Sequence, residues 1–392
     1  MLTDSQRQIV RSTVPLLETG GEALTTHFYR IMLDEFPVVR PLFNQAHQAS
    51  GEQPRALANG VLAYARHIDH LEALGDLAAQ IVQKHVSLQV QPEHYPIVGQ
   101  CLLRAIREVL GPDVATDEVV DAWAAAYQQL ADLLIGAEEQ VYASTAAAPG
   151  GWRGARPFRI AGKVRESSEI VSFHLAPVDG GPVVAHQPGQ YIGVRLSIDG
   201  EEHRRNYSLS AAPDGHRFRI SVKREPEGRV SNHLHDAMRE GDTLDVFPPA
   251  GHFTLQPGQR PIVMISGGVG ITPLLAMLEP AIDSGRDVTF IHCARNADVH
   301  AFRERIDALA EREPRLKRYY CYEQPSPHVE ADAVGLIDER MLARWLPATR
   351  DVDAYFLGPK PFMRVIKRGL QALGVPETQT RFEFFGPAAT LA

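Results

Sequence analysis

His85 is the first candidate for a residue with a chemical role, because of its side chain and its position in the sequence. It lies in the stretch DLAAQIVQKHVSLQV and shares one helical stripe with Ile81 and Leu88, which are four and three residues away. Imidazole is the most common metal ligand in proteins. A histidine on an apolar stripe is more often a core residue with one hydrogen-bonded nitrogen, so the stripe alone leaves both interpretations open.

A glycine-rich turn has the composition of a phosphate-binding site. In IVMISGGVGITPLL a buried-strand run ends at Gly267, Gly268 and Gly270. Thr272 and Pro273 are predicted to open a helix as its N-cap and first-turn proline. The backbone can approach a ligand closely at glycines, and a helix N-terminus offers unpaired amides, so a pyrophosphate would bind there. A tight strand-to-helix turn without a ligand explains the same residues.

Two further stretches carry chemically useful groups. RRNYSLS, residues 204–210, places a cation, an aromatic ring and a hydroxyl on one short strand, and GRVSNHLH follows about twenty residues later. Together with SGGVGITP, these stretches resemble the ferredoxin-reductase family of flavin enzymes in their order and spacing. The resemblance implies an FAD-binding barrel followed by a nicotinamide-nucleotide domain.

The elements that must position these residues divide the chain into three domains. Helical spacing predicts an all-α domain over residues 1–145, and ASTAAAPGGWRGARPF predicts a linker over 146–155. Short alternating runs separated by Asp-Gly and Pro-Gly turns predict an antiparallel β-barrel over 156–258. The buried-strand runs PIVMIS, DVTFIHCA and DAYFLG alternate with helical patterns, which predicts an α/β domain with a parallel sheet over 259–392.

Composition and charge exclude several classes of protein. The 48 acidic and 40 basic side chains give a formal charge of -8, which argues against binding to nucleic acid. Cys101, Cys293 and Cys321 are scattered without CxxC spacing, so neither a zinc site nor a disulfide framework is indicated, and a cytoplasmic location is expected. The stretch MLTDSQRQIV has no cationic segment followed by an apolar core, and no apolar run reaches the roughly 18 residues of a membrane span, so we expect neither secretion nor a membrane-spanning segment.

The reductase resemblance assigns roles to residues of the FAD domain. Arg205 matches the pyrophosphate contact, Tyr207 the ring that packs on the flavin, and Ser208 the hydroxyl near the reactive flavin nitrogen. FEFFGP near the C-terminus matches the segment with a flavin-stacking aromatic, here Phe385. An apolar ring at that position would exclude water from the isoalloxazine. The full FAD-binding set is Tyr191, Arg205, Asn206, Tyr207, Ser208, Ser231, Phe384, Phe385, Gly386 and Pro387.

The same resemblance defines a nucleotide site and one departure from the family. The family's cysteine-glycine-proline turn is here Leu357-Gly358-Pro359, so a thiol near the nicotinamide is absent. Arg295 follows the second strand of the domain and could pair with a ribose 2'-phosphate, but a solvated surface arginine is equally consistent, so NADH and NADPH both stay open. The NAD(P)-binding set is Gly267, Gly268, Val269, Gly270, Ile271, Thr272, Pro273, Arg295, Gly358 and Pro359.

A flavin reductase needs an electron acceptor, and the helical domain has the size of a globin. His85 lies about 42 residues after Phe43 and about 32 after Gln53, which are globin spacings for the haem-packing phenylalanine, the distal position and the proximal histidine. Tyr29 lies on the predicted second helix, before these residues, and Leu57 shares a face with Gln53. The domain resembles the globin of flavohaemoglobins, and with it the resemblance covers the whole chain.

The flavohaemoglobin resemblance implies a complete haem pocket. His85 would ligate the iron of haem b, and a carboxylate behind its imidazole would favour dioxygen activation over reversible carriage. Glu139 is an adjacent alternative to Glu138 for that carboxylate. The remaining roles are a distal pair that hydrogen-bonds iron-bound dioxygen (Tyr29, Gln53), an apolar residue above the iron (Leu57), a haem-packing ring (Phe43), a proximal pair (Tyr95, Glu138) and two redox-tuning residues (Lys84, Glu383).

The predicted function is that of a nitric oxide dioxygenase. NADH or NADPH would reduce FAD, FAD would pass single electrons to the haem, and nitric oxide with dioxygen would give nitrate. Two alternatives stay open: haem-dependent reduction of peroxides or of nitric oxide without oxygen, and an oxygen carrier or sensor whose reductase maintains ferrous iron. We expect a monomer, and an apolar ligand such as a lipid could enter the distal pocket.

Overall fold

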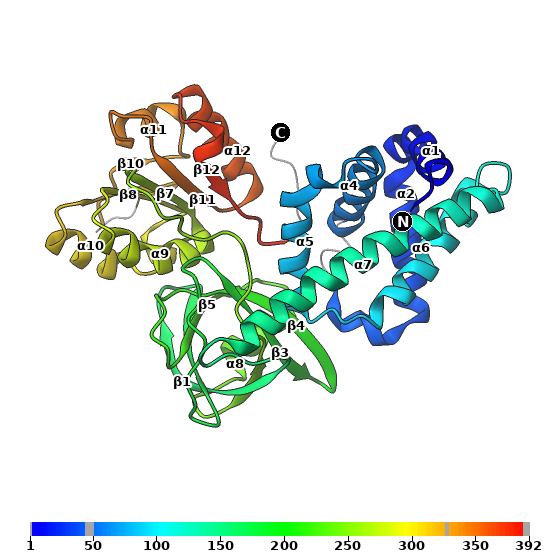
Figure 1. Ribbon diagram of the computed structural model, residues 1–392. Coiled ribbons are helices and arrows are strands. Elements are labelled where there is room, and N and C mark those ends of the chain that lie inside the picture. Colours follow the sequence, from blue (N-terminus) through cyan, green and yellow to red (C-terminus); the bar gives the residue numbers. More distant parts are fainter. Residues whose placement is uncertain (1, 44–50, 326–328, 387–392) are drawn as a thin grey trace. The chain divides into compact units, whose positions relative to one another are not determined.

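The computed structural model describes residues 2–43, 51–325 and 329–386 (Figure 1). Pro387, which was predicted to contact FAD, lies outside the described residues. The chain divides into two compact units, a mainly helical one that includes residues 2–43 and 51–147 and a second one that carries two sheets. Among the helices described, none combines the length and apolar character needed to cross a membrane.

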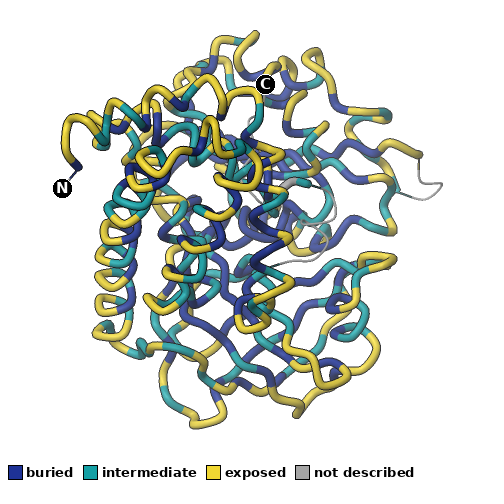
Figure 2. Tube along the Cα trace, turned by 90° about the vertical axis from the view of Figure 1, so that its right-hand side faces the viewer, coloured by how far each residue is buried: buried dark blue, intermediate teal, exposed yellow. Residues whose placement is uncertain are grey.

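The helical unit is built from amphipathic helices. Along them buried residues recur on one side and exposed residues on the other (Figure 2). Phe28, Met32 and Trp123 are part of the buried core. The helices are α1 (Asp4–Ser12), α2 (Val14–Glu35), η1 (Pro37–Leu42), α4 (Glu52–Arg66), η2 (Leu71–Leu74), α5 (Gly75–Leu88), α6 (His94–Leu110) and α7 (Asp117–Ala147).

Local signals start and stop the helices that matter for the site. Thr3 caps α1 with a capping box in which its side chain and that of Gln6 bond each other's backbone amides. Helix α5 ends at Gln89, which adopts a left-handed conformation with φ 60°, so the chain turns away directly after the stretch that holds His85. Gly111 ends α6 with a positive φ of 75° but an extended ψ of 166°, a conformation that glycine tolerates.

The first sheet of the second unit is antiparallel. Its six strands pair in the order β4-β3-β6-β1-β2-β5. An isolated bridge between Leu209, just beyond β4, and Ile220 of β5 joins the two edges and closes the sheet as a barrel. The elements are β1 (Arg156–Arg165), β2 (Ile170–Pro177), β3 (Tyr191–Ile198), β4 (Glu201–Ser208), β5 (Phe218–Lys223), helix α8 (Arg229–Asp236) and β6 (Thr243–Val246).

The second sheet has six strands in the order β10-β9-β8-β7-β11-β12, and every strand pair is parallel. The strands are β7 (Ile262–Gly267), β8 (Val288–Ala294), β9 (Leu316–Tyr322), β10 (Ala333–Val334), β11 (Asp353–Leu357) and β12 (Thr380–Phe382). The helices are η3 (Gly268–Gly270), α9 (Ile271–Asp283), η4 (Ala297–Val299), α10 (Arg303–Arg312), α11 (Glu339–Trp345), α12 (Lys360–Ala372) and η5 (Glu377–Gln379).

Helices cover both faces of this parallel sheet (Figure 1). One face packs on α9 and α10 through Met264 and Phe290, and the other packs on α11 and α12 through Ile265 and Ile291. Strand β7, in the interior of the sheet, is buried at every position because both of its faces are covered. The all-α unit, the antiparallel barrel and the α/β sheet predicted from the sequence are therefore all present. Ligands of such sheets bind beyond the carboxyl ends of the strands.

Candidate functional site

The structure joins three residues predicted for the proximal side of a haem. The Nδ1 atom of His85 on α5 lies 2.7 Å from Oε1 of Glu138 on α7 and 3.1 Å from the hydroxyl of Tyr95 on α6. The Tyr95 hydroxyl also donates to the same Glu138 oxygen at 2.5 Å. Glu139, the alternative carboxylate, is exposed. Three helices thus converge on one ring nitrogen of His85.

Glu138 is a buried carboxylate, with a side chain that is 3% exposed. Burial, and then the hydrogen bond to Glu138, raises the pKa of Tyr95, so its hydroxyl stays protonated and donates. Because Nδ1 faces these two groups, Nε2 is the nitrogen left for a metal, and it has no hydrogen-bond partner among the residues the structure describes. This arrangement fits an axial haem ligand, whose second nitrogen is held by an acceptor.

Two tyrosines outside the predicted set hold the proximal helices in place. Tyr127 of α7 donates to the backbone carbonyl of Tyr95 at 2.6 Å, and a Cβ on Gly99 would lie 2.6 Å from the Tyr127 ring. Tyr142, one turn after Glu138, donates to the carbonyl of Val90 at 2.9 Å. These bonds fix the start of α6 and the end of α5 against α7. The sequence had no signal for them, since aromatic residues at helical spacing are usually ordinary core.

The predicted distal residues also meet. Tyr29 of α2 is 7% exposed, and its ring packs edge-to-face on Phe43 with centroids 5.6 Å apart. A side-chain hydrogen bond joins Tyr29 to Gln53 at the start of α4; burial raises the pKa of Tyr29 more than this bond lowers it. The hydroxyl therefore remains protonated at any physiological pH. A buried phenol beside an amide can donate hydrogen bonds to a small polar ligand.

Helix α4 is tied to α2 near these residues. The Thr25 hydroxyl donates to the carbonyl of Pro54 at 2.8 Å, one residue after Gln53. Leu57, one turn further along α4, is partly buried against the core of the helical unit. Thr25 was not predicted as part of the site. It positions the first turn of α4, and with it the Gln53 side chain.

The residues predicted to bind FAD lie on β4, on α8 and at the start of β3. Asn206, Tyr207 and Ser208 close β4, where Tyr207 packs against the barrel core. Arg205, one residue earlier, donates to the Arg204 carbonyl at 2.7 Å. All four side chains of the RNYS stretch are thus only partly buried on one strand.

Helix α8 and strand β3 carry two more of these residues. The Ser231 hydroxyl accepts from the Glu225 amide at 3.2 Å and donates to the Gly228 carbonyl at 3.1 Å, so it holds the turn that opens α8. A Cβ on Gly228 would lie 2.4 Å from the Ser231 oxygen. Tyr191, 6% exposed, packs so closely on Gly251 that a Cβ there would lie 2.8 Å from its ring. The start of α8 is therefore tightly packed around Gly228 and Ser231.

The C-terminal aromatics differ in exposure. Phe384 packs at right angles on Phe382, with centroids 5.7 Å apart, and is partly buried. Phe385 is 48% exposed, although it is a large apolar ring. Gly386 follows directly and is half-buried. An exposed ring at this position has a free face on which a flavin can stack.

The two predicted nucleotide turns come together at the carboxyl edge of the parallel sheet. A Cβ on Gly358, after β11, would lie 3.2 Å from the Cα of Gly267, after β7, and 2.5 Å from the Phe362 ring. A Cβ on Gly270 would lie 2.5 Å from the Leu357 carbonyl oxygen. Only glycine allows this approach, which leaves a backbone-lined edge where a dinucleotide fits. Val269, Ile271 and Pro359 lie in the same turns.

The N-cap predicted at Thr272 is wrong. Helix α9 begins at Ile271, one residue earlier, and Gly270 precedes it. The Thr272 hydroxyl instead donates to the Val269 carbonyl at 3.0 Å from inside the first turn, where Pro273 also lies. Because η3 (Gly268–Gly270) already runs into the helix, no extended residue remains to serve as a side-chain cap.

Arg295 is paired within the protein. Its guanidinium forms an ion pair with Glu169, from the turn between β1 and β2. Glu169 was not predicted as part of the site, since nothing in the local sequence links residues 126 positions apart. A ribose 2'-phosphate would have to compete with this carboxylate for the arginine.

The two predicted redox-tuning residues lie in different units. Lys84 precedes His85 on α5 and is half-buried, and Glu383 follows β12 and is half-buried.

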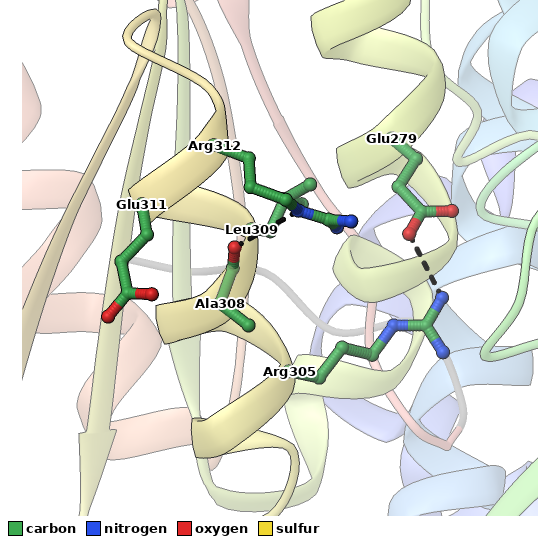
Figure 3. Close-up of a pocket in the computed structure, with 6 residues that line it drawn as sticks. All are labelled: Glu279, Arg305, Ala308, Leu309, Glu311 and Arg312. Atoms are coloured by element: carbon green, nitrogen blue, oxygen red, sulfur yellow. Dashed lines mark hydrogen bonds and ion pairs between the residues drawn. The ribbon is translucent and has the colours of Figure 1, made fainter.

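A separate pocket of about 440 Å³ opens between α9 and α10 (Figure 3). Arg305 donates to Glu279 across it at 3.1 Å. No residue predicted for the site lines this pocket.

Comparison with known proteins matches the three domains. Residues 26–134 match the globin family model, 157–255 the oxidoreductase FAD-binding domain and 264–368 the oxidoreductase NAD-binding domain. Flavohemoproteins of Pseudomonas putida and Pseudomonas aeruginosa are 67% and 65% identical, each over the full length of both chains. These domains carry haem, FAD and a nicotinamide nucleotide.

Two solved structures resemble the chain. A flavohemoglobin from Malassezia yamatoensis, with bound FAD and haem, superposes with a TM-score of 0.87 at 26% identity and covers 98% of this chain and 100% of its own. The flavohem-like FAD/NAD-binding domain of nitric oxide dioxygenase from Vibrio cholerae matches at 35% identity with a TM-score of 0.56. It covers 60% of this chain and 100% of its own.

Proposed function

The chain belongs to the flavohaemoprotein family, and we propose that within it the protein acts as a nitric oxide dioxygenase. Nitric oxide and dioxygen would combine with one electron to give nitrate. Since a reduced nicotinamide supplies two electrons, one nucleotide supports two such turnovers. Support comes from the Vibrio cholerae relative of the reductase part, which carries the name nitric oxide dioxygenase.

The observation that carries the proposal is the contact of His85 with Glu138. A carboxylate 2.7 Å from Nδ1 gives the imidazole partial imidazolate character, because the ring proton is shared with a buried anion. A ring of this kind donates more electron density to a metal at Nε2 and favours dioxygen activation over reversible binding. Tyr95 supports the arrangement by donating to the same carboxylate oxygen.

Tyr29 and Gln53 provide the hydrogen bonding that a partly anionic ligand needs. When dioxygen takes up electron density, a buried hydroxyl stabilises the resulting negative charge by donating a hydrogen bond. The bond between Tyr29 and Gln53 orients that hydroxyl before the ligand arrives, and the packing of Phe43 against Tyr29 keeps the ring in place. The pocket is thereby prepared for a partly anionic diatomic ligand.

The second unit supplies the electrons. When bound, FAD takes a hydride and releases single electrons, and haem provides the site where one electron meets the two gases. The protein's task is to place the nicotinamide and the flavin close together. The glycine-lined edge at Gly267, Gly270 and Gly358 would hold the nucleotide, and β4 with α8 would hold the flavin.

The test is reduction of the purified holoprotein with NADH or NADPH without air, followed by mixing with dioxygen and nitric oxide. We expect nitric oxide consumption that requires dioxygen, nitrate as the product and two nitric oxide molecules removed for each nucleotide oxidised. Equal consumption without dioxygen, or nitrous oxide in place of nitrate, would refute the proposal. Slow dioxygen release with negligible nitric oxide turnover would also refute it and would indicate a carrier.

A further inference from the structure

Two cysteines that lie 28 residues apart in the sequence are neighbours in the parallel sheet. Cys293 of β8 and Cys321 of β9 are direct partners in the strand register. Neighbouring strands are about 4.8 Å apart, and paired residues of parallel strands point to the same face. A disulfide joins Cα atoms about 4.4 to 6.8 Å apart, so the backbone already brings the two thiols within bonding range.

The two thiols lie on the same face of the sheet, where Cys321 donates to the Gly335 carbonyl at 3.2 Å. The neighbouring Cys321 thiol raises the pKa of Cys293, and the Cys293 thiol lowers the pKa of Cys321.

The two cysteines differ in accessibility. Cys321 is 1% exposed and packs on Met341, whereas Cys293 is partly exposed. Cys293 is thus the more accessible of the two residues.

We propose that Cys293 and Cys321 form a reversible disulfide that weakens nicotinamide-nucleotide binding. A peroxide transfers one oxygen to one of the two sulfurs, giving a sulfenic acid and one molecule of water or alcohol. The other thiol then attacks that sulfur, the S–S bond forms, and the oxygen leaves as water with the thiol proton. The two thiols lose two electrons and the peroxide gains them; an external dithiol reverses the reaction.

The bond acts at the edge that binds the nucleotide. Cys293 lies near the carboxyl end of β8, two residues before Arg295, and Cys321 lies one residue before the end of β9. A bridge between the two side chains fixes the spacing of the two strand ends. The turns that follow β8 and β9 flank the ribose of a bound dinucleotide in this type of sheet.

The experiment uses the full-length holoprotein with all three cysteines reduced. It is treated with hydrogen peroxide or with diamide, a thiol oxidant that spares the haem, and free thiols are then counted after denaturation. We expect the count to fall from three to one, with tryptic peptides 287–295 and 319–340 joined, and dithiothreitol to restore it. Cys101→Ser should still form the bridge, whereas Cys293→Ser and Cys321→Ala should not.

The functional readout is anaerobic reduction of ferricyanide by NADH, which uses the flavin and does not depend on nitric oxide chemistry. Oxidation should raise the KM for NADH roughly three- to tenfold, with a smaller change in kcat, and leave the KM of Cys293→Ser unchanged. Separate modification of the two thiols without joined peptides would overturn the proposal. So would a bridge that forms without any change in KM, or loss of two thiols in Cys293→Ser.

Discussion

The Nδ1 atom of His85 lies 2.7 Å from the Oε1 atom of Glu138, although the two residues are 53 positions apart on different helices. This contact determines which ring nitrogen faces a metal and how basic that nitrogen is. The neighbouring Glu139 is exposed, so only one of two adjacent carboxylates can have this effect. The relationship leads to the first prediction.

Glu138→Gln should lower nitric oxide dioxygenase activity while haem remains bound. An amide can accept the Nδ1 proton but carries no charge, so the loss is that of a charge-assisted bond, about 1.5 to 3 kcal/mol, or roughly ten- to a hundredfold in rate. Stopped-flow turnover and the haem reduction potential, which should rise, report the effect. Glu139→Gln is the matched control, and an equal loss in both variants would contradict the assignment.

Tyr29→Phe should speed the loss of dioxygen from the reduced protein. It removes one hydrogen bond to a partly anionic ligand, worth about 1.5 to 3 kcal/mol, so the off-rate should rise roughly ten- to a hundredfold. Tyr64→Phe provides the comparison, because Tyr64 is also buried in the helical unit but donates to the Ala126 carbonyl. If flash photolysis finds the same off-rate in wild type and Tyr29→Phe, Tyr29 does not face the ligand.

Glu169→Gln should improve the use of NADPH. The substitution removes the carboxylate that pairs with Arg295, so the guanidinium becomes available for a 2'-phosphate. We expect the KM for NADPH to fall roughly tenfold, with little change for NADH. Glu166→Gln, in the same turn, controls for the loss of one negative charge. An NADPH KM that falls equally in the control would mean that general charge, and not Arg295, is responsible.

The parallel sheet should lose stability in mild acid because His292 of β8 and His300, which follows η4, are buried beside each other. Burial lowers the pKa of His292 to about 3, and burial also lowers the pKa of His300, whose ring lies 4.3 Å from that of His292. Below a pH of about 6.5 the unfolded chain binds protons that the folded sheet excludes, so the free energy of unfolding falls by up to about 1.4 kcal/mol per pH unit for each histidine. The contribution of the two histidines to stability is fully present above that pH and is lost as the pH falls toward their pKa values in the folded protein.

Hydrogen exchange of β8 and β9, corrected for the intrinsic rate, checks this prediction at pH 7.5 and pH 5.5. His292→Gln removes one titrating group and should reduce the difference in protection between the two pH values. His216→Gln, at an exposed position, should not. A pH dependence that is identical in all three proteins would show that the buried histidines do not control it.

Much of the fold follows from patterns that are local in the sequence. The spacing of apolar residues reports which face of a helix or strand is buried, and this spacing correctly predicted an all-α domain, an antiparallel barrel and a parallel α/β sheet. Motif order along the chain placed the glycine turns at Gly267 and Gly358, and the structure brings both to one edge. The N-cap at Thr272 was misplaced because η3 runs directly into α9.

Only the tertiary structure decided the contacts between elements that are distant in the sequence. Periodicity does not specify how helices α5 and α7 are rotated about their axes, so it could not distinguish Glu138 from Glu139. It does not specify which strands pair or in which register, so Cys293 and Cys321 were scattered in the sequence and are neighbours in the sheet. The Arg295 partner was hidden for the same reason. A sequence pattern records burial, whereas the chemistry of a pair depends on register and packing.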